Sequence, residues 1–201
     1  SECLVGSEMC IRDSSITRYA DCSIEVEDHG RGIPVDYNNN EKCFNWELVF
    51  CELYAGGKYN NNEGESYEFS LGLNGLGLCS TQYSSEYMDV DIRRDGYRYL
   101  LHFEKGENVG GLKKEPYGKK DTGTKIRWKP DLSVFTDIDV SPQYYIDVIK
   151  RQAIVNAGVT FIFRNQAGKT FEMTEFQYRE GITDPVSYTH LRAHETLANL
   201  V

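Results

Sequence analysis

The sequence predicts an α+β fold in which helices cover a mixed, mostly antiparallel β-sheet. The strongest observation is a pair of alternating runs, residues 86–94 and 97–104, which flank Asp95-Gly96, a dipeptide typical of β-hairpin turns. A second observation is the helical spacing of apolar residues over 142–155, a pattern that ends at Asn156-Ala157-Gly158. No internal repeat and no linker interrupt residues 15–180, so this order of elements fits one helix-covered domain.

The first part of the chain is expected to form a hairpin followed by a helix. Residues 15–19 and 24–28 are short β-prone runs separated by four residues, which indicates a hairpin that ends at Asp28. The polar run 37–42 is expected to be a loop. Apolar residues at partly helical spacing over 46–54 predict a helix that stops at Ala55-Gly56-Gly57.

The rest of the chain adds a long connection, a helix, a strand and a second hairpin. Residues 58–77 are polar and rich in glycine, and we expect a lid, because loops of this length in compact domains are usually disordered or functional. A helix is predicted over 77–84. A strand is predicted over 123–129, with Trp128 buried. The second hairpin is predicted from the runs 159–164 and 169–174, which flank Asn165-Gln166-Ala167-Gly168.

The composition bounds the function. The 201 residues are 40% hydrophobic and 26% charged, enough for one full-sized core. A formal net charge of −9 argues against direct binding of nucleic acid, which needs a basic surface. No apolar run approaches the length of a membrane span, and no segment directs export. The cysteines of the expected domain form no Cys-x-x-Cys pair and are interpreted as reduced thiols of a cytoplasmic protein: Cys22, Cys43, Cys51 and Cys79.

Both ends of the chain resemble translated sequencing adapter. Residues 4–14 and 186–196 match two reading frames through a common transposase-type adapter. We therefore expect residues 1–14 to lie outside the fold, residues 15–181 to form the domain, and residues 182–201 to be mostly an adapter-derived tail. With the ends set aside, no metal site is predicted.

Three glycine-bearing segments mark the expected functional site. Asp28-His29-Gly30-Arg31-Gly32-Ile33-Pro34 follows a predicted strand, Leu71-Gly72-Leu73-Asn74-Gly75-Leu76-Gly77 precedes a predicted helix, and Thr122-Gly123-Thr124 opens another strand. A carboxylate at a strand end can accept a hydrogen bond from the exocyclic amine of adenine. A glycine-rich loop that enters a helix offers backbone N–H groups to phosphates. Each segment alone also fits an ordinary turn or helix entry.

In this order, the motifs resemble the ATPase domain of the B subunits of bacterial type IIA DNA topoisomerases, within the GHKL superfamily. Tyr54-Ala55-Gly56-Gly57-Lys58-Tyr59 favours this branch over other superfamily members. The resemblance spans residues 15–181 and implies a GHKL (Bergerat-type) two-layer sandwich, truncated at its N-terminus. It favours the B subunit of DNA gyrase, and the B subunit of topoisomerase IV is the alternative, because the two share every motif discussed.

The resemblance also assigns site residues. Asp28 would bind the adenine amine, and Thr124 would help to hold the adenine edge. The lid would contribute Lys58 and Tyr67, and a glycine-rich loop would hold the phosphates. The full expected ATP-binding set is Asp28, Gly32, Ile33, Pro34, Gly56, Gly57, Lys58, Tyr67, Gly72, Leu73, Asn74, Gly75, Leu76, Gly77 and Thr124.

Finally, the resemblance implies what the parent enzyme does and what this chain lacks. Members of the family use ATP and Mg²⁺ to pass one DNA duplex through another in the bacterial cytoplasm, together with an A subunit and a second B subunit. Their general-base Glu and Mg²⁺-binding Asn lie on a helix upstream of the position that residue 15 occupies here. We therefore expect no catalytic and no metal-binding residue in this chain, and ATP as its only ligand. A non-hydrolysing nucleotide-binding or interaction module is the alternative from another class.

Overall fold

The computed structural model describes residues 13–56 and 75–178, and the backbone of residues 188–191. The elements are β1 (Asp13–Arg18), β2 (Ile24–Asp28), β3 (Tyr37–Asn38), β4 (Cys43–Phe44), α1 (Asn45–Phe50), α2 (Gly77–Tyr83), β5 (Ser85–Arg94), β6 (Tyr97–Glu104), β7 (Glu107–Asn108), β8 (Lys113–Pro116), β9 (Gly123–Pro130), α3 (Pro142–Val155), β10 (Thr160–Ala167), β11 (Thr170–Gln177) and β12 (Tyr188–Leu191).

Within the described residues, ten strands form one sheet. Their order is β12-β11-β10-β1-β2-β9-β5-β6-β7, with β8 paired to β6, while β3 and β4 form a separate ribbon. The β1–β10 pair is parallel, and the other described pairs of the large sheet are antiparallel. The sheet is therefore mixed and mostly antiparallel, as the sequence predicted.

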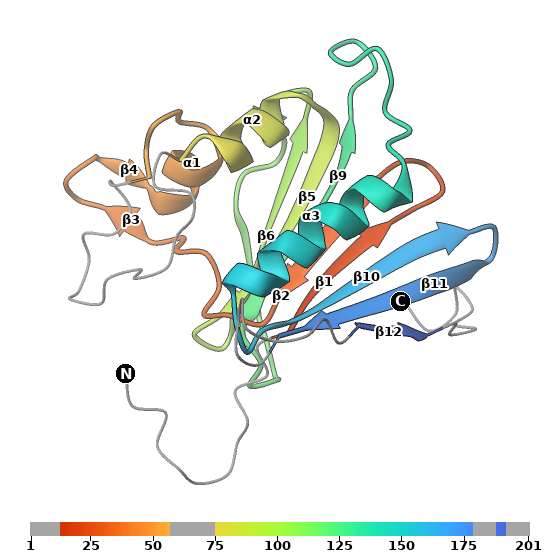
Figure 1. Cartoon of the computed structure of the whole chain (residues 1–201). Coiled ribbons are helices and arrows are strands. Elements are labelled where there is room, and N and C mark those ends of the chain that lie inside the picture. The colour runs from red at the N-terminus through yellow and green to blue at the C-terminus, as the bar shows by residue number, and fades with distance from the viewer. Residues whose placement is uncertain (1–12, 57–74, 179–187, 192–201) are drawn as a thin grey trace, which may run out of the picture.

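An apolar row crosses the central strands and defines the covered face of the sheet. Its members stand opposite one another on neighbouring strands: Phe163 of β10, Ile16 of β1, Val26 of β2, Ile126 of β9, Val90 of β5 and Leu101 of β6. Side chains that are opposite in register project from the same face. Helix α1 packs on the β5–β6 end of this row and α3 on the β10 end, so both cover one face (Figure 1).

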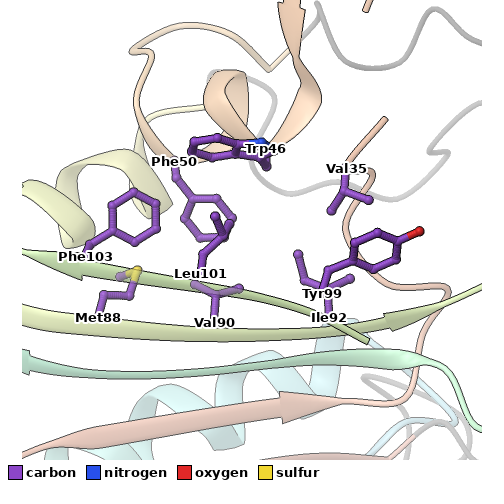
Figure 2. Packing of buried hydrophobic residues seen from close by; sticks show 9 residues of the cluster. All are labelled: Val35, Trp46, Phe50, Met88, Val90, Ile92, Tyr99, Leu101 and Phe103. Atoms are coloured by element: carbon purple, nitrogen blue, oxygen red, sulfur yellow. The ribbon is translucent and has the colours of Figure 1, made fainter. Parts of the chain in front are cut away.

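The first core lies between α1 and strands β5 and β6. Trp46 and Phe50 of α1 lie over Phe103, with ring-centroid distances of 6.5 and 5.6 Å (Figure 2). The remaining buried members are Val35, Met88, Val90, Ile92, Tyr99 and Leu101. Because Val35 comes directly after Pro34 and is only 6% exposed, this core anchors the loop that follows β2.

The second core lies between α3 and the other half of the sheet. Ile149 and Ala153 of α3 pack with Phe163 of β10 and Phe176 of β11. Tyr145 stacks on Phe163 with a centroid distance of 5.8 Å. The helix begins at Pro142 after Ser141, whose hydroxyl accepts a hydrogen bond from the Gln143 backbone N–H at 3.3 Å. The capping residues at the start of α3 and the apolar stripe that it buries both lie within this segment. The helix therefore has the bounds that the sequence predicted.

The opposite face of the sheet carries cross-strand ion pairs. Arg98 contacts Asp91 at 2.8 Å, and Lys129 contacts Glu86 at 3.1 Å. His102 lies between two carboxylates, with Nδ1 at 2.6 Å from Asp89 Oδ1 and Nε2 at 3.2 Å from Glu104 Oε1. The hydrogen bond to Asp89, followed by that to Glu104, raises the pKa of His102 although burial acts against it.

This environment predicts a small pH-dependent stability. Because the folded-state pKa of His102 is raised, its stabilisation is complete below the unfolded value of about 6.5 and is lost as the pH rises through the folded value. The side chain is 37% exposed, so solvent screening keeps the effect at about 0.5 kcal/mol. Urea unfolding of the wild type and His102→Gln at pH 6 and pH 9 should give a larger stability difference at pH 6. A larger difference at pH 9 would contradict the assignment.

Most predicted elements are confirmed, with shifts at their ends. The hairpins β1–β2 and β5–β6, helices α2 and α3, and strand β9 lie where the sequence placed them. Helix α1 ends at Phe50 rather than Tyr54, which has a left-handed φ of 62° incompatible with a helix. The second hairpin turns at Gly168-Lys169, because β10 continues to Ala167.

Three further features differ from the prediction. The start of the polar run 37–42 forms strand β3, which pairs with β4 just after the run. Strands β7 and β8 had no apolar alternation that could predict them. Trp128 is only partly buried. The predicted lid at 58–77 lies mostly outside the described residues. Among the described ranges, no helix is long and apolar enough to cross a membrane.

Described residues from both expected terminal segments pair with the sheet. Strand β1 begins at Asp13, and the backbone of β12 pairs with β11, with Leu191 opposite Met173. Residues 13–14 and 188–191 therefore pair with the domain although the sequence placed them outside it. Strand pairing does not report where a sequence came from, so the assignment of the two ends to adapter stays a prediction, as does the boundary at 181.

Candidate functional site

Strand β2 places Asp28 beside Thr124 of β9. The two residues are opposite in the antiparallel register, two positions beyond the apolar pair Val26 and Ile126. Because side chains alternate between faces, Asp28 and Thr124 project from the same helix-covered face as that pair. The sequence motifs named both residues, and the strand register brings them together.

The carboxylate of Asp28 is half-buried and only partly engaged. Its Oδ1 accepts a hydrogen bond from the Gly30 backbone N–H at 2.8 Å, a geometry that closes the turn after β2. Among the described residues, no group donates a hydrogen bond to its Oδ2. An ionised carboxylate accepts through both oxygens, so one of them is available to a ligand.

Thr124 joins the glycine-rich turn to β9. Its side chain is buried, with the residue 4% exposed, and its Oγ1 accepts a hydrogen bond from the Ile33 backbone N–H at 3.1 Å. A threonine hydroxyl also has one proton to donate, and the described residues offer it no acceptor. The buried hydroxyl next to Asp28 can therefore serve a polar ligand or a bridging water.

Two glycines allow the backbone segments of this site to approach closely. Gly32 has a φ of 80°, and a Cβ there would lie 2.9 Å from the Arg93 carbonyl oxygen. Gly123 has a φ of 147°, and a Cβ there would lie 2.1 Å from the carbonyl oxygen of Asp28. The turn after β2 and the start of β9 therefore fit against their neighbours only with glycine at these positions.

The second part of the predicted site lies where α2 begins. A Cβ at Gly75, which has a φ of 62°, would lie 2.5 Å from the Gly56 backbone nitrogen, so the two glycine segments touch. Leu76 precedes Gly77 at the start of α2, and no side chain caps this helix end. Leu78 and Ile33 pack against the same first core, which connects the two parts of the site.

The structure thus places nine of the fifteen predicted site residues. The first group is Asp28, Gly32, Ile33, Pro34 and Thr124, and the second is Gly56, Gly75, Leu76 and Gly77. The other six lie outside the described residues: Gly57, Lys58, Tyr67, Gly72, Leu73 and Asn74. Within the described ranges, no three His, Cys, Asp or Glu side chains are grouped to hold a metal ion.

Sequence reasoning missed the charged residues behind the first group. Arg93 of β5 binds Glu27 at 2.8 Å and Asp121 at 3.4 Å, while Arg94 Nη1 donates to the Gly32 carbonyl at 3.5 Å. Glu27 lies 66 residues from Arg93 in the chain, so no local pattern could have indicated this contact.

Comparisons with known proteins give relatives of one kind, although no family model matches the sequence. The chain is 36% identical over 167 residues to the B subunit of DNA topoisomerase 4 from Salmonella typhimurium and 34% identical over 174 residues to the B subunit of DNA gyrase from Thermotoga maritima. This chain is homologous to the B subunits of type II DNA topoisomerases. The matches cover 83% and 86% of this topoisomerase homologue, but it spans only 26% of the length of each relative.

A solved structure extends the likeness to the fold. The topoisomerase IV ATP-binding domain of Francisella tularensis, solved with a small-molecule inhibitor, superposes with a TM-score of 0.68 at 31% identity. The match covers 85% of the topoisomerase homologue and 44% of that chain. The predicted α+β, GHKL-type architecture is thereby confirmed. Gyrase and topoisomerase IV relatives match at similar identity, so the preference for gyrase stays a prediction.

Proposed function

We propose that this chain is the ATP-binding part of the B protein of a type II topoisomerase. The observation that carries the proposal is that Asp28 and Thr124 lie opposite each other in register on the helix-covered face. One Asp28 carboxylate oxygen, to which no described residue donates, lies there beside a buried hydroxyl. Gly32, Ile33 and Pro34 follow on the turn that Thr124 holds, and would form the wall for the base and ribose.

The chemistry of this pair favours adenine over guanine. Adenine carries an exocyclic amine that donates hydrogen bonds, whereas guanine carries a carbonyl acceptor at the equivalent ring position. A carboxylate oxygen of Asp28 would accept from the adenine amine, while the guanine carbonyl would face it as a second acceptor. The Thr124 hydroxyl, held by Ile33, would contribute a further polar contact directly or through water.

The triphosphate is assigned to the start of α2 and to the lid. Backbone N–H groups around Gly75, Leu76 and Gly77 would bind phosphate oxygens, since this helix start lacks a side-chain cap. The proposed contributors outside the described residues are Gly57, Lys58, Tyr67, Gly72, Leu73 and Asn74. Within the described residues, no three His, Cys, Asp or Glu side chains are grouped to hold the Mg²⁺ that the parent protein would use.

For the parent protein, we propose ATP-dependent passage of DNA duplexes in the bacterial cytoplasm. Its partners would be DNA, an A subunit and a second B subunit. The proposal is supported by homology to the B subunits of both gyrase and topoisomerase IV, and gyrase remains the preferred assignment. We propose hydrolysis and Mg²⁺ binding for the parent protein, and ATP binding for this chain.

Calorimetric titration of the full chain with ATP and GTP tests the proposal. ATP is expected to bind at least about tenfold more tightly than GTP, because the guanine carbonyl would face the Asp28 carboxylate and both groups are acceptors. Circular dichroism establishes that the protein is folded. A folded chain that binds both nucleotides equally, or neither of them, would contradict the adenine-pocket assignment.

A further inference from the structure

Arg93 lies on the sheet face opposite the candidate adenine pocket. Its neighbours in the β5 sequence, Ile92 and Arg94, flank it, and Ile92 is fully buried on the covered face. Glu27 likewise precedes Asp28, so Arg93 and Glu27 project from the uncovered face while Asp28 projects from the covered one. Arg93 is therefore placed behind the pocket rather than within it.

The Arg93 guanidinium joins both strands that form the pocket. Its Nη2 contacts Glu27 Oε1 at 2.8 Å, and its Nη1 contacts Asp121 Oδ2 at 3.4 Å. Glu27 is the residue before Asp28 on β2, and Asp121 lies three residues before Thr124 of β9. The Arg93 side chain thus binds both the end of β2 and the loop that leads into β9.

The loop that carries Asp121 is fixed at two further points. The Tyr117 hydroxyl donates to Asp121 Oδ2 at 3.1 Å, and the Tyr117 backbone N–H donates to the Gly96 carbonyl at 2.9 Å. Gly123 lies opposite Arg93 in register, and a Cβ there would come within 3.1 Å of Arg93 Nη2. The guanidinium therefore covers the start of β9 at the point where that strand approaches Asp28.

The Arg93–Glu27 pair is more buried than the Arg98–Asp91 and Lys129–Glu86 pairs on the same face. The Arg93 side chain is 11% exposed and that of Glu27 is 23% exposed. Burial acts to lower the pKa of Arg93, but Glu27, Tyr117 and Asp121 together raise it, so the charged form is well held. Partly buried charge pairs lose more on removal of one partner than exposed pairs do, because the other charge stays desolvated.

We propose that Arg93 is a positioning residue for adenine recognition, which fixes the separation of Asp28 and Thr124 by binding Glu27 and Asp121 at the same time. The inference rests on the proposed ATP binding, and it adds a residue that touches no ligand. The Arg93 backbone serves the same site, since its carbonyl packs against Gly32 in the turn after β2.

The experiment compares Arg93→Gln with Arg98→Gln in the full 201-residue chain. Arg98 is the cross-strand neighbour of Arg93 and pairs with Asp91 at 2.8 Å, but among the ion pairs of the described residues it joins neither Glu27 nor Asp121. Arg93→Gln is expected to raise the Kd for ATP about tenfold and to reduce the preference for ATP over GTP. Arg98→Gln should change both by less than about twofold. Arg93→Lys, which can keep one ion pair but not both, should lie between.

A purely structural ion pair would give a different result. It would lower the urea midpoint of Arg93→Gln without changing nucleotide selectivity in the folded protein, and this outcome would overturn the proposal. If Arg93→Gln does not fold, Asp121→Asn tests the same link at a site whose side chain is 41% exposed. That variant should weaken ATP binding about threefold, and unchanged affinity would overturn the proposal as well.

The result also separates this inference from the proposed function. If the wild type binds ATP selectively and Arg93→Gln does so equally well, only the positioning role fails. If the folded wild type binds no ATP, the proposed function fails, and the inference fails with it.

Discussion

Replacing Asp28 with Asn should reduce ATP affinity at least about 100-fold while leaving the fold intact. The carboxylate uses one oxygen for the Gly30 N–H at 2.8 Å and offers the other to the adenine amine. An asparagine amide has one acceptor oxygen, so it can serve the turn or the adenine amine but not both. The substitution loses a hydrogen bond to a charged group and can place the new amide N–H against the adenine amine, which is also a donor. Together these effects cost about 2.7 kcal/mol, which corresponds to a loss of about 100-fold in affinity.

Calorimetric titration with ATP measures this loss, and Asp131→Asn is the matched control. Asp131 follows β9, and its Oδ1 accepts from the Ser133 backbone N–H at 2.7 Å, the same two-residue turn geometry that Asp28 has with Gly30. The control should bind ATP like the wild type. Affinity within about threefold of wild type for folded Asp28→Asn would show that the adenine amine is not bound by this carboxylate.

Elements with local signals could be predicted from the sequence. The turn at Asp95-Gly96 needs two residues with positive φ, observed at 54° and 77°, and few dipeptides adopt this conformation as readily. Helix α3 is determined by Ser141 and Pro142 at its start and by the apolar stripe that α3 buries. In both cases the information lies within about fifteen residues, so pattern reasoning could find it.

Elements that depend on distant partners could not be predicted. The parallel pairing of β1 with β10 joins Ile16 to Phe163, and nothing local in either strand specifies the other. Strand β8, Lys113–Pro116, is exposed throughout and is ordered by pairing with β6, so it lacks the apolar alternation that marks a strand. Helix α1 ends at Phe50, and Tyr54 beyond it adopts a left-handed conformation that its residue type does not require.

The residues of the candidate site also fall into those with a local sequence signal and those that depend on distant partners. Asp28, Thr124 and the glycines lie in short motifs, so their identities could be read from the sequence, but their relation depends on the β2–β9 register. In the sequence, Arg93 is one of several polar residues on an alternating strand. Its proposed role behind the pocket follows only from its contacts with Glu27 and Asp121. Motifs therefore predict what touches a ligand better than what holds those groups in place.

Gly123→Ala should destabilise the protein by about 3 kcal/mol and remove ATP binding. The added Cβ would lie 2.1 Å from the Asp28 carbonyl oxygen and 3.1 Å from Arg93 Nη2, and the φ of 147° is unfavourable for alanine. The carbonyl belongs to the β2 backbone and cannot move without disturbing the pairing with β9, so strain and lost pairing add together. Any relaxed structure would also shift Asp28 away from Thr124.

Urea unfolding and ATP titration of Gly123→Ala measure the two effects, with Gly118→Ala as the matched control. Gly118 lies in the loop before β9, and a Cβ there would meet no atom within 4 Å. Its substitution should change stability by less than about 0.5 kcal/mol and leave ATP binding unchanged. Equal stability of the two variants would mean that β2 and β9 are not in the close contact described. A Gly123→Ala protein that is destabilised but binds ATP normally would separate this contact from the adenine pocket.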